Sequence, residues 1–192
     1  MLLFILNTVS FIFVAFIVNK YQKATIEVEN AYQTQYNSLI LAEELRQSSD
    51  DLTRMARTYV ITGDPMFEKQ FKMVFDIRNG DKPRPKRYNG IFWDFYTIDD
   101  STAKFEGEKI ALKELMKKAN FPESELNLLF KSQKESDDLT NLEHKAMNAV
   151  KGNFQDKDGN YTIKGEPDFK LAREIMHSSE YHEAKKRIME PL

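Results

Sequence analysis

Six residues of this sequence carry side chains well suited to hold a small carboxylate. Guanidinium groups bind carboxylates through paired hydrogen bonds, and aromatic rings form the walls of small-molecule sites. The alternative is that the arginines form structural ion pairs near an apolar core. The predicted ligand-binding residues are Arg54, Arg57, Tyr59, Arg78, Trp93 and Tyr96.

A second segment resembles a calcium-binding loop, because Asp156, Asp158 and Asn160 alternate along it. An EF-hand loop requires glycine at its sixth position and a bidentate glutamate at its twelfth. Those positions hold Tyr161 and Pro167. We therefore expect a solvated turn and no calcium site.

A Glu-x-x-His element at Glu174 and His177 is the third candidate. Four-helix di-iron proteins use this element twice, together with two further glutamates, and here it occurs once. His177 and His182 are five residues apart, so they do not share a helix face. Only convergence of distant residues could build a metal site, and we expect no metal and no cofactor.

Several classes of function are disfavoured by composition. The chain has no cysteine, which excludes disulfides, thiolate zinc sites and a cysteine nucleophile. The net charge of −2 offers no basic surface for nucleic acid. No phosphate loop, nucleophile elbow, zinc-protease motif or dinucleotide fingerprint is present. We expect no catalytic residues and no enzymatic activity in this chain.

A long helix must position these residues. No proline or glycine occurs between Tyr21 and Ile61, and apolar residues recur there at steps of three and four, which predicts one buried stripe. The stripe consists of Val28, Tyr32, Tyr36, Leu39, Ala42, Leu45, Leu52, Met55, Ala56 and Tyr59. Ser48, Ser49 and Asp50 interrupt it, which predicts one polar layer in the fold.

The remaining elements are also predicted to be helical. The turn Thr62–Pro65 ends the first helix, with Gly63 in a left-handed conformation, Asp64 as the next N-cap and Pro65 in the first turn. We expect Ile91–Tyr96, as strand or helix, to dock on the others. Further helices are predicted at residues 65–78, 109–119, about 121–152 and about 167–192. The helix at 121–152 is predicted to have Asn120 as its N-cap and to lie antiparallel to the first helix. The last helix is predicted to break in two at His177. The expected fold is an all-α, elongated antiparallel bundle of four to five helices.

The N-terminus is predicted to span a membrane. Leu2–Val18 contains no charge and reaches the lower limit for a bilayer, about 17 residues. It lacks a basic start and a small-residue cleavage site, which favours an uncleaved transmembrane helix over residues 1–19. Lys20 and Lys23 follow it, and by charge alone they would place the rest of the chain in the cytoplasm.

The sequence resembles the extracytoplasmic input regions of sensor histidine kinases, methyl-accepting chemotaxis receptors and diguanylate cyclases of bacteria. The resemblance is carried by Arg54–Asp64, Ile77–Gly80, Pro83–Pro85, Trp93–Asp94, Ala146–Gly152, Gly165–Asp168, Tyr181–His182 and Ile188–Pro191. It implies an inner-membrane protein whose residues 20–192 form a periplasmic sensor domain, truncated before a second transmembrane helix and an output domain. It therefore opposes the topology given by the two lysines.

Three hypotheses follow. The leading one is a periplasmic signal-sensing bundle that responds to a small solute or a periplasmic binding protein, as a homodimer attached to the membrane. The second is a structural or dimerisation module without a small ligand, paired along the stripe from Val28 to Tyr59. The third is a membrane-anchored metal-binding protein.

Overall fold

The computed structural model describes residues 1–86, 88, 91–96 and 105–192, and 73% of these described residues are helical. Within the described residues there are seven helices and one two-stranded sheet, which confirms the predicted all-α class. The chain divides into two compact units, Met1–Leu39 and Ile40–Leu192. The two units are described separately.

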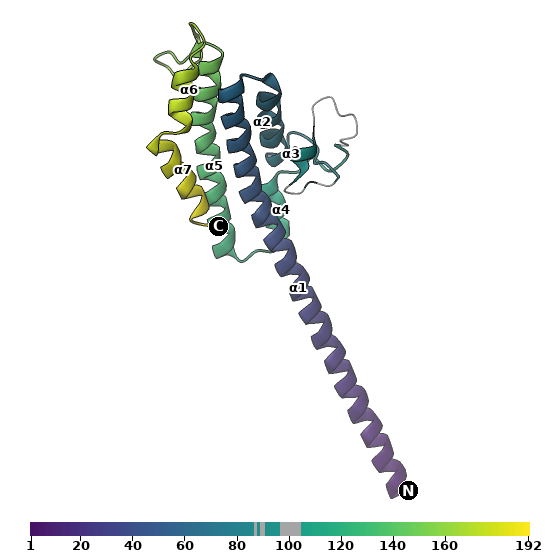
Figure 1. The fold of residues 1–192 in the computed structure, drawn as a ribbon. Helices are drawn as coiled ribbons and strands as arrows, with labels where there is room; N and C mark the ends of the chain where they lie inside the picture. Colours follow the sequence, from purple (N-terminus) through teal and green to yellow (C-terminus); the bar gives the residue numbers. More distant parts are fainter. Residues whose placement is uncertain (87, 89–90, 97–104) are drawn as a thin grey trace. The chain divides into compact units, whose positions relative to one another are not determined.

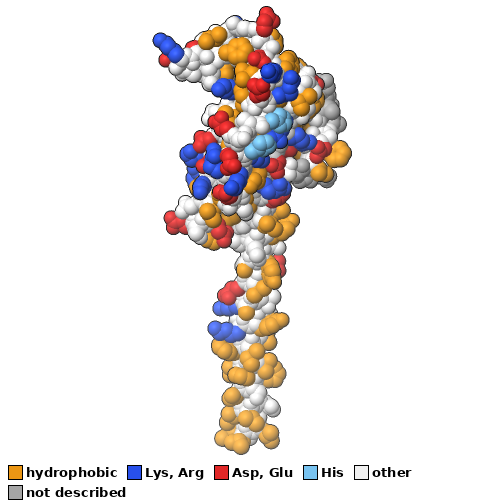
Figure 2. All heavy atoms as spheres, turned by 60° about the vertical axis from the view of Figure 1, so that its left-hand side comes forward, with side chains coloured by type: hydrophobic (Ala, Val, Ile, Leu, Met, Phe, Trp, Pro, Cys, Tyr) orange, Lys and Arg blue, Asp and Glu red, His pale blue; other side chains and the backbone are white. Residues whose placement is uncertain are grey.

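The first unit is the N-terminal part of α1, the helix Leu2–Thr62. Figure 2 shows apolar side chains covering the first turns of this helix. Among the described residues, α1 alone is long and apolar enough to cross a membrane. The apolar segment predicted from the sequence is therefore present as a helix.

The predicted buried stripe is only half correct. Leu45, Leu52 and Met55 are buried, but Val28 and Tyr32 are exposed, as are Tyr36 and Leu39. The reason is that Met1–Leu39 is a single helix, and a single helix has no second layer on which its apolar stripe can pack.

The second unit is a four-helix bundle that runs up, down, up and down (Figure 1). Its members are the end of α1, α2 (Pro65–Arg78), α5 (Glu123–Val150), and the pair α6 (Phe169–Met176) and α7 (Ser179–Met189). The main core lies between these helices, and a small second cluster gathers Leu45, Leu112, Met116 and Leu129.

The prediction that α5 lies antiparallel to α1 is wrong. Leu45 packs with Leu129, and further along both helices Thr53 contacts Glu143, so the two helices run in the same direction. The segment between α2 and α5 returns the chain to the starting end of the bundle, where Glu123 begins α5. The antiparallel neighbours of α5 are α2, α6 and α7.

The predicted turn after α1 is confirmed. Gly63 has a φ of 69°, and the Asp64 carboxylate accepts a hydrogen bond from the backbone N–H of Met66 at 2.9 Å. Pro65 lies in the first turn of α2. The predicted break near His177 is also confirmed, because Ser178 caps α7 by accepting a hydrogen bond from the N–H of Tyr181.

The segment between α2 and α5 contains two short helices. α3 (Phe92–Phe95) settles the strand-or-helix alternative in favour of helix, and buried Trp93 docks it on the bundle. α4 (Leu112–Lys118) is shorter than predicted. Asn120 is not an N-cap: its φ of 57° places it in the left-handed conformation that follows a helix end, and α5 starts after Pro122.

The connection from α5 to α6 is a small hairpin of β1 (Asn153–Phe154) and β2 (Ile163–Lys164). Its turn includes the calcium-like segment. The Asp156 carboxylate accepts hydrogen bonds from the backbone N–H groups of Asp158 and Asn160 and from the hydroxyl of Thr162. The acidic side chain thus organises an exposed turn.

Candidate functional site: a polar layer and a cavity beside α1

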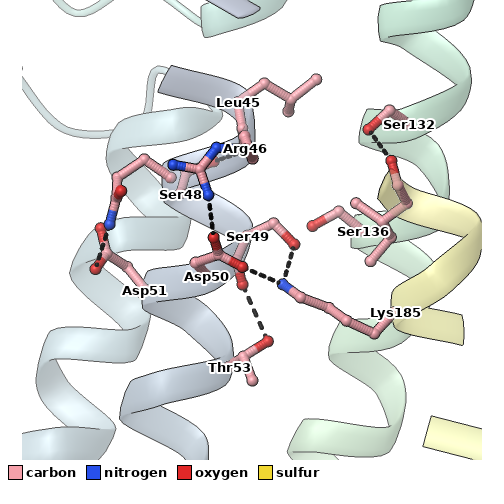
Figure 3. A network of polar contacts seen from close by, with 12 residues as sticks. Leu45, Arg46, Ser48, Ser49, Asp50, Asp51, Thr53, Ser132, Ser136 and Lys185 are labelled. Atoms are coloured by element: carbon pink, nitrogen blue, oxygen red, sulfur yellow. Dashed lines mark hydrogen bonds and ion pairs between the residues drawn. The ribbon is translucent and has the colours of Figure 1, made fainter. Parts of the chain in front are cut away.

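The predicted polar layer is present where α1 meets α7 (Figure 3). Ser49 is buried, and its hydroxyl lies 3.0 Å from Nζ of Lys185 on α7. The same ammonium pairs with Asp50 at 2.9 Å, and Arg46 approaches the other oxygen of Asp50 at 2.7 Å. One lysine therefore connects α7 to two adjacent residues of α1.

A second part of the layer joins three helices. Glu143 on α5 is 1% exposed, and its Oε1 accepts hydrogen bonds from the hydroxyls of Tyr181 at 2.7 Å and Thr53 at 3.5 Å. Burial raises the pKa of Glu143 to about 7, although these hydroxyls and the charges of Lys185 and Arg78 oppose the rise. Burial, reinforced by the Glu143 charge, also raises the pKa of Tyr181.

Arg57 covers the outer side of this group. Its guanidinium lies 5.1 Å from the centroid of the Tyr181 ring, and Nη2 donates to the carbonyl oxygen of Met176 at 3.3 Å. Its Nε is buried without a hydrogen-bond partner among the described residues. Arg57 thus holds the junction of α6 and α7 against α1.

Arg78 ties α2 to α5 in the same bundle. Its side chain is 1% exposed and donates to Ser136 at 2.8 Å and to Asp137 at 2.7 Å. The Phe75 ring lies 5.5 Å from the guanidinium, and burial lowers the pKa of Arg78. A fully buried arginine with these partners functions as a structural tie between helices.

A cavity of about 150 Å³ lies on another face of the same part of α1. One α1 face supplies most of its lining, and an aromatic side chain from the segment after α2 supplies the rest. The lining residues are Ile40, Glu43, Glu44, Gln47, Ser48, Asp51 and Tyr88. We refer to this space as the α1–Tyr88 cavity.

The wall opposite α1 is fixed by contacts between aromatic and charged residues. Arg84 forms an ion pair with Glu44, and its guanidinium lies 5.7 Å from the centroid of the Tyr88 ring. Trp93 donates from Nε1 to the Tyr88 hydroxyl at 3.3 Å. Burial raises the pKa of Tyr88 to about 12, so this hydroxyl stays neutral at physiological pH.

Asp51 is the most buried carboxylate of the cavity, with 4% of its side chain exposed. Arg54 donates to its Oδ1 at 2.9 Å, and Gln47 donates to the same oxygen at 3.3 Å. Oδ2 accepts no hydrogen bond from any described residue. Burial raises the pKa of Asp51, and the bonds from Arg54 and Gln47 offset part of the rise.

The six predicted ligand-binding residues fall into separate groups. Arg54 forms an ion pair with Asp94 on α3, beside Trp93 and Tyr96, whose ring centroids lie 5.5 Å apart. The other three do not join them: Arg57 faces α6 and α7, Arg78 faces α5, and Tyr59 lies in the main core. Ligand binding by these residues stays a prediction.

Sequence reasoning missed Glu143, Asp51 and Tyr88. Glu143 had a visible signal, because it occupies an apolar position between Leu139 and Met147 in the helical repeat of α5. Tyr88 had none, because the residues that its side chain contacts depend on the tertiary fold.

No protein-family model, curated protein or solved structure matches this chain. Its function must therefore be argued from its own residues.

Proposed function

We propose that this chain is the extracytoplasmic signal-input region of a bacterial transmembrane receptor, in which α1 relays changes in the bundle to the membrane. The observation that carries the proposal is the continuity of α1, which includes both the apolar segment Leu2–Val18 and the polar layer at Ser48–Thr53. A helix transmits a displacement that a flexible linker would absorb. The sequence resemblance to receptor input regions supports the same role.

The polar layer supplies the element that would change state. Its contacts are directional, and two of its side chains have two partners each: Lys185 contacts Ser49 and Asp50, and Asp50 contacts Lys185 and Arg46. Small displacements of helices, on the order of 1–2 Å, are a common output of such packing changes. A ligand that prefers one arrangement would shift the population towards it.

Cysteine labelling tests the periplasmic location. The chain has no cysteine, so Asp158→Cys introduces a single thiol on the exposed hairpin turn. We expect a membrane-impermeant maleimide to label this variant in intact cells, to the same extent as after lysis. Labelling that occurs only after lysis would place the bundle in the cytoplasm and overturn the proposal.

A helix-phase experiment tests the relay. In a receptor that carries this chain as its input region, insertion of one residue after Asn37 rotates the two parts of α1 by about 100° relative to each other. We expect the signalling output to change. The matched control is one residue inserted after Lys157, in the exposed turn, which should leave the output unchanged. An unchanged output with the α1 insertion would contradict a relay through this helix.

A second candidate function is a dimerisation module, favoured by the exposed apolar stripe on the first unit. Val28 and Tyr32 are 54% and 66% exposed, and apolar residues at this spacing bury themselves when two helices pair. Sedimentation of the full chain in detergent should show a dimer that Val28→Glu weakens, whereas Gln33→Glu, also exposed, should not. A monomer at all concentrations would contradict this function.

A further inference from the structure

The geometry points to a small aromatic carboxylate as the ligand of a second cavity, which is lined by residues of α2 and α5. We refer to this space as the α2–α5 cavity. The role of the ligand as a signal rests on the proposed function, whereas its binding is a property of this chain alone. Two features lead to this class of ligand: the apolar floor of the cavity, and the positive charges of its lining that lack close partners.

The size and the floor of the cavity suit an aromatic body. Its volume is about 430 Å³, and sites for small molecules span roughly 300–1,000 Å³. Phe71, Phe75 and Met147 line it, and Phe71 and Met147 are each 1% exposed, so packing in the main core holds them in place. An aromatic ring packs favourably against other rings and against methionine sulfur.

The two carboxylates of the lining are already paired with lysines from elsewhere. Glu68 forms an ion pair with Lys151 at 2.6 Å, and Asp76 forms one with Lys82 at 3.4 Å. Neither of these lysines is among the described residues that line the cavity. The carboxylates therefore leave the positive charges of the lining itself largely uncompensated.

Lys69 and Lys72 carry these positive charges. Lys69 has no ion-pair partner among the described residues, and Lys72 lies 3.8 Å from Asp76, longer than a charge-assisted hydrogen bond of about 2.7–2.9 Å. The two lysines are three residues apart on α2, so they share one face of the helix. Two ammonium groups attract an anion, and the paired carboxylates beside them favour one negative charge over two.

His144 on α5 adds a hydrogen-bond donor. Its ring packs edge-to-face on Phe71 with centroids 5.3 Å apart, and it has no hydrogen-bond partner among the described side chains. Burial and the charges of Lys151 and Lys72 lower the pKa of His144, although Glu68 opposes the decrease. The imidazole is therefore neutral at neutral pH, and its N–H is free to donate to a carboxylate.

The test compares phenylacetate with 2-phenylethanol and 2-phenylethylammonium, which share its ring, and with acetate, which shares its charge. Each probe is titrated into the full chain in detergent at constant ionic strength, and binding is followed by the NMR signals of the protein. We expect saturable binding of phenylacetate and at least about tenfold weaker binding of the other three. Equal or tighter binding of the alcohol, the ammonium or acetate would overturn the inference.

The histidine signals locate the site without any substitution. The chain has three histidines, His144, His177 and His182. We expect phenylacetate to shift the signals of His144 alone and to raise the pKa of His144, because a nearby carboxylate stabilises the imidazolium. Changes at His177 or His182 with none at His144 would place the ligand on α6 and α7 and overturn the inference.

Variants test the contribution of the two lysines. Lys69→Gln combined with Lys72→Gln removes both charges and should weaken phenylacetate binding about tenfold. Lys145→Gln is the matched control, an exposed lysine on α5 outside the described lining, and it should bind like the wild type. If the double variant, shown folded by circular dichroism, binds phenylacetate like the wild type, the cavity is not the site.

The outcome is separable from the proposed function. Phenylacetate binding together with a bundle that is labelled only after lysis would leave the ligand class intact and remove the input role. No phenylacetate binding together with a periplasmic bundle would remove the ligand class and leave the input role.

Discussion

The hydroxyl of Tyr181 donates a 2.7 Å hydrogen bond to Glu143 inside the bundle. The two residues belong to α7 and α5, and Thr53 of α1 reaches the same carboxylate oxygen. Three of the four members of the bundle therefore meet at one buried carboxyl group. The protonation of that acid affects the stability of the whole unit.

Stability should decrease as pH rises through neutrality. The folded-state pKa of Glu143 is raised to about 7 from its ordinary value of 4.5, so folding favours the protonated form. This contribution is complete below about pH 4.5 and is lost as the pH passes about 7. We expect wild type to lose up to about 3 kcal/mol relative to Glu143→Gln between these limits. Urea unfolding across this pH range measures the difference.

The comparison with Glu143→Gln separates this acid from other titrating groups. Burial lowers the pKa of His144 and of His177, so their contributions change with pH in the opposite sense. Both histidines are present in both proteins and cancel in the difference. If the two proteins show parallel pH profiles, Glu143 is ionised throughout and its predicted titration is wrong.

Arg78 should be essential for stability. Arg78→Ala removes two charge-assisted hydrogen bonds and leaves a void between α2 and α5, and we expect a loss of about 3 kcal/mol or more in the free energy of unfolding. The control is Lys134→Ala, which removes an exposed ion pair with Asp138 and should cause no measurable change. Equal effects of the two variants would show that Arg78 is not a tie between helices.

Alanine substitutions at two glycines distinguish the cost of backbone strain from the cost of a steric clash. Gly152 and Gly159 have φ values of 68° and 83°. A Cβ at Gly152 would lie 2.2 Å from the carbonyl oxygen of Gly165, whereas a Cβ at Gly159 meets nothing described within 4 Å. Gly159→Ala should cost about 1 kcal/mol and Gly152→Ala roughly 2 kcal/mol more, in thermal or urea unfolding. Similar losses would mean that the hairpin can move away from Gly152.

The Lys185 contact can be measured by a double-mutant cycle. Asp50→Asn and Lys185→Met should couple by about 1 kcal/mol, because the ammonium is held between two side chains of α1 and is only 20% exposed. Glu174→Gln with Lys170→Met provides the comparison, an exposed pair at 3.9 Å within α6 that should show no coupling. Absence of coupling in the first cycle would remove Lys185 from the layer.

Local sequence signals predicted the turn after α1, the break before α7 and the polar layer. Gly63, Asp64 and Pro65 determine the turn after α1 through backbone conformation and capping, which depend on neighbours in sequence. Ser48 and Ser49 interrupt an apolar repeat, and an interruption by small polar residues marks a polar layer wherever the helix packs. These features did not require knowledge of the tertiary fold.

The direction of α5 and the cavity could not be predicted in the same way. The direction of α5 relative to α1 depends on the tertiary fold, and no local sequence pattern encodes it. Arg54 and Arg57 are three residues apart on one helix, yet one pairs with Asp94 of α3 and the other contacts Met176 of α6. Helix periodicity gives the face of a residue, but it does not identify the element that covers that face.

The polar layer has contacts at two positions along α7, and these contacts restrict how α7 can move along α1. Lys185 meets Ser49 and Asp50, and one turn along α7 Tyr181 meets Glu143 beside Thr53. A slide of α7 along α1 by one turn, about 5.4 Å, would separate both sets of partners at once and remove the Tyr181 donor from buried Glu143. Rotation or tilting of α1 by small amounts keeps them within reach. The polar layer thus fixes the register of α7 on α1. It opposes a translation of one full turn and permits only small rotations or tilts of α1.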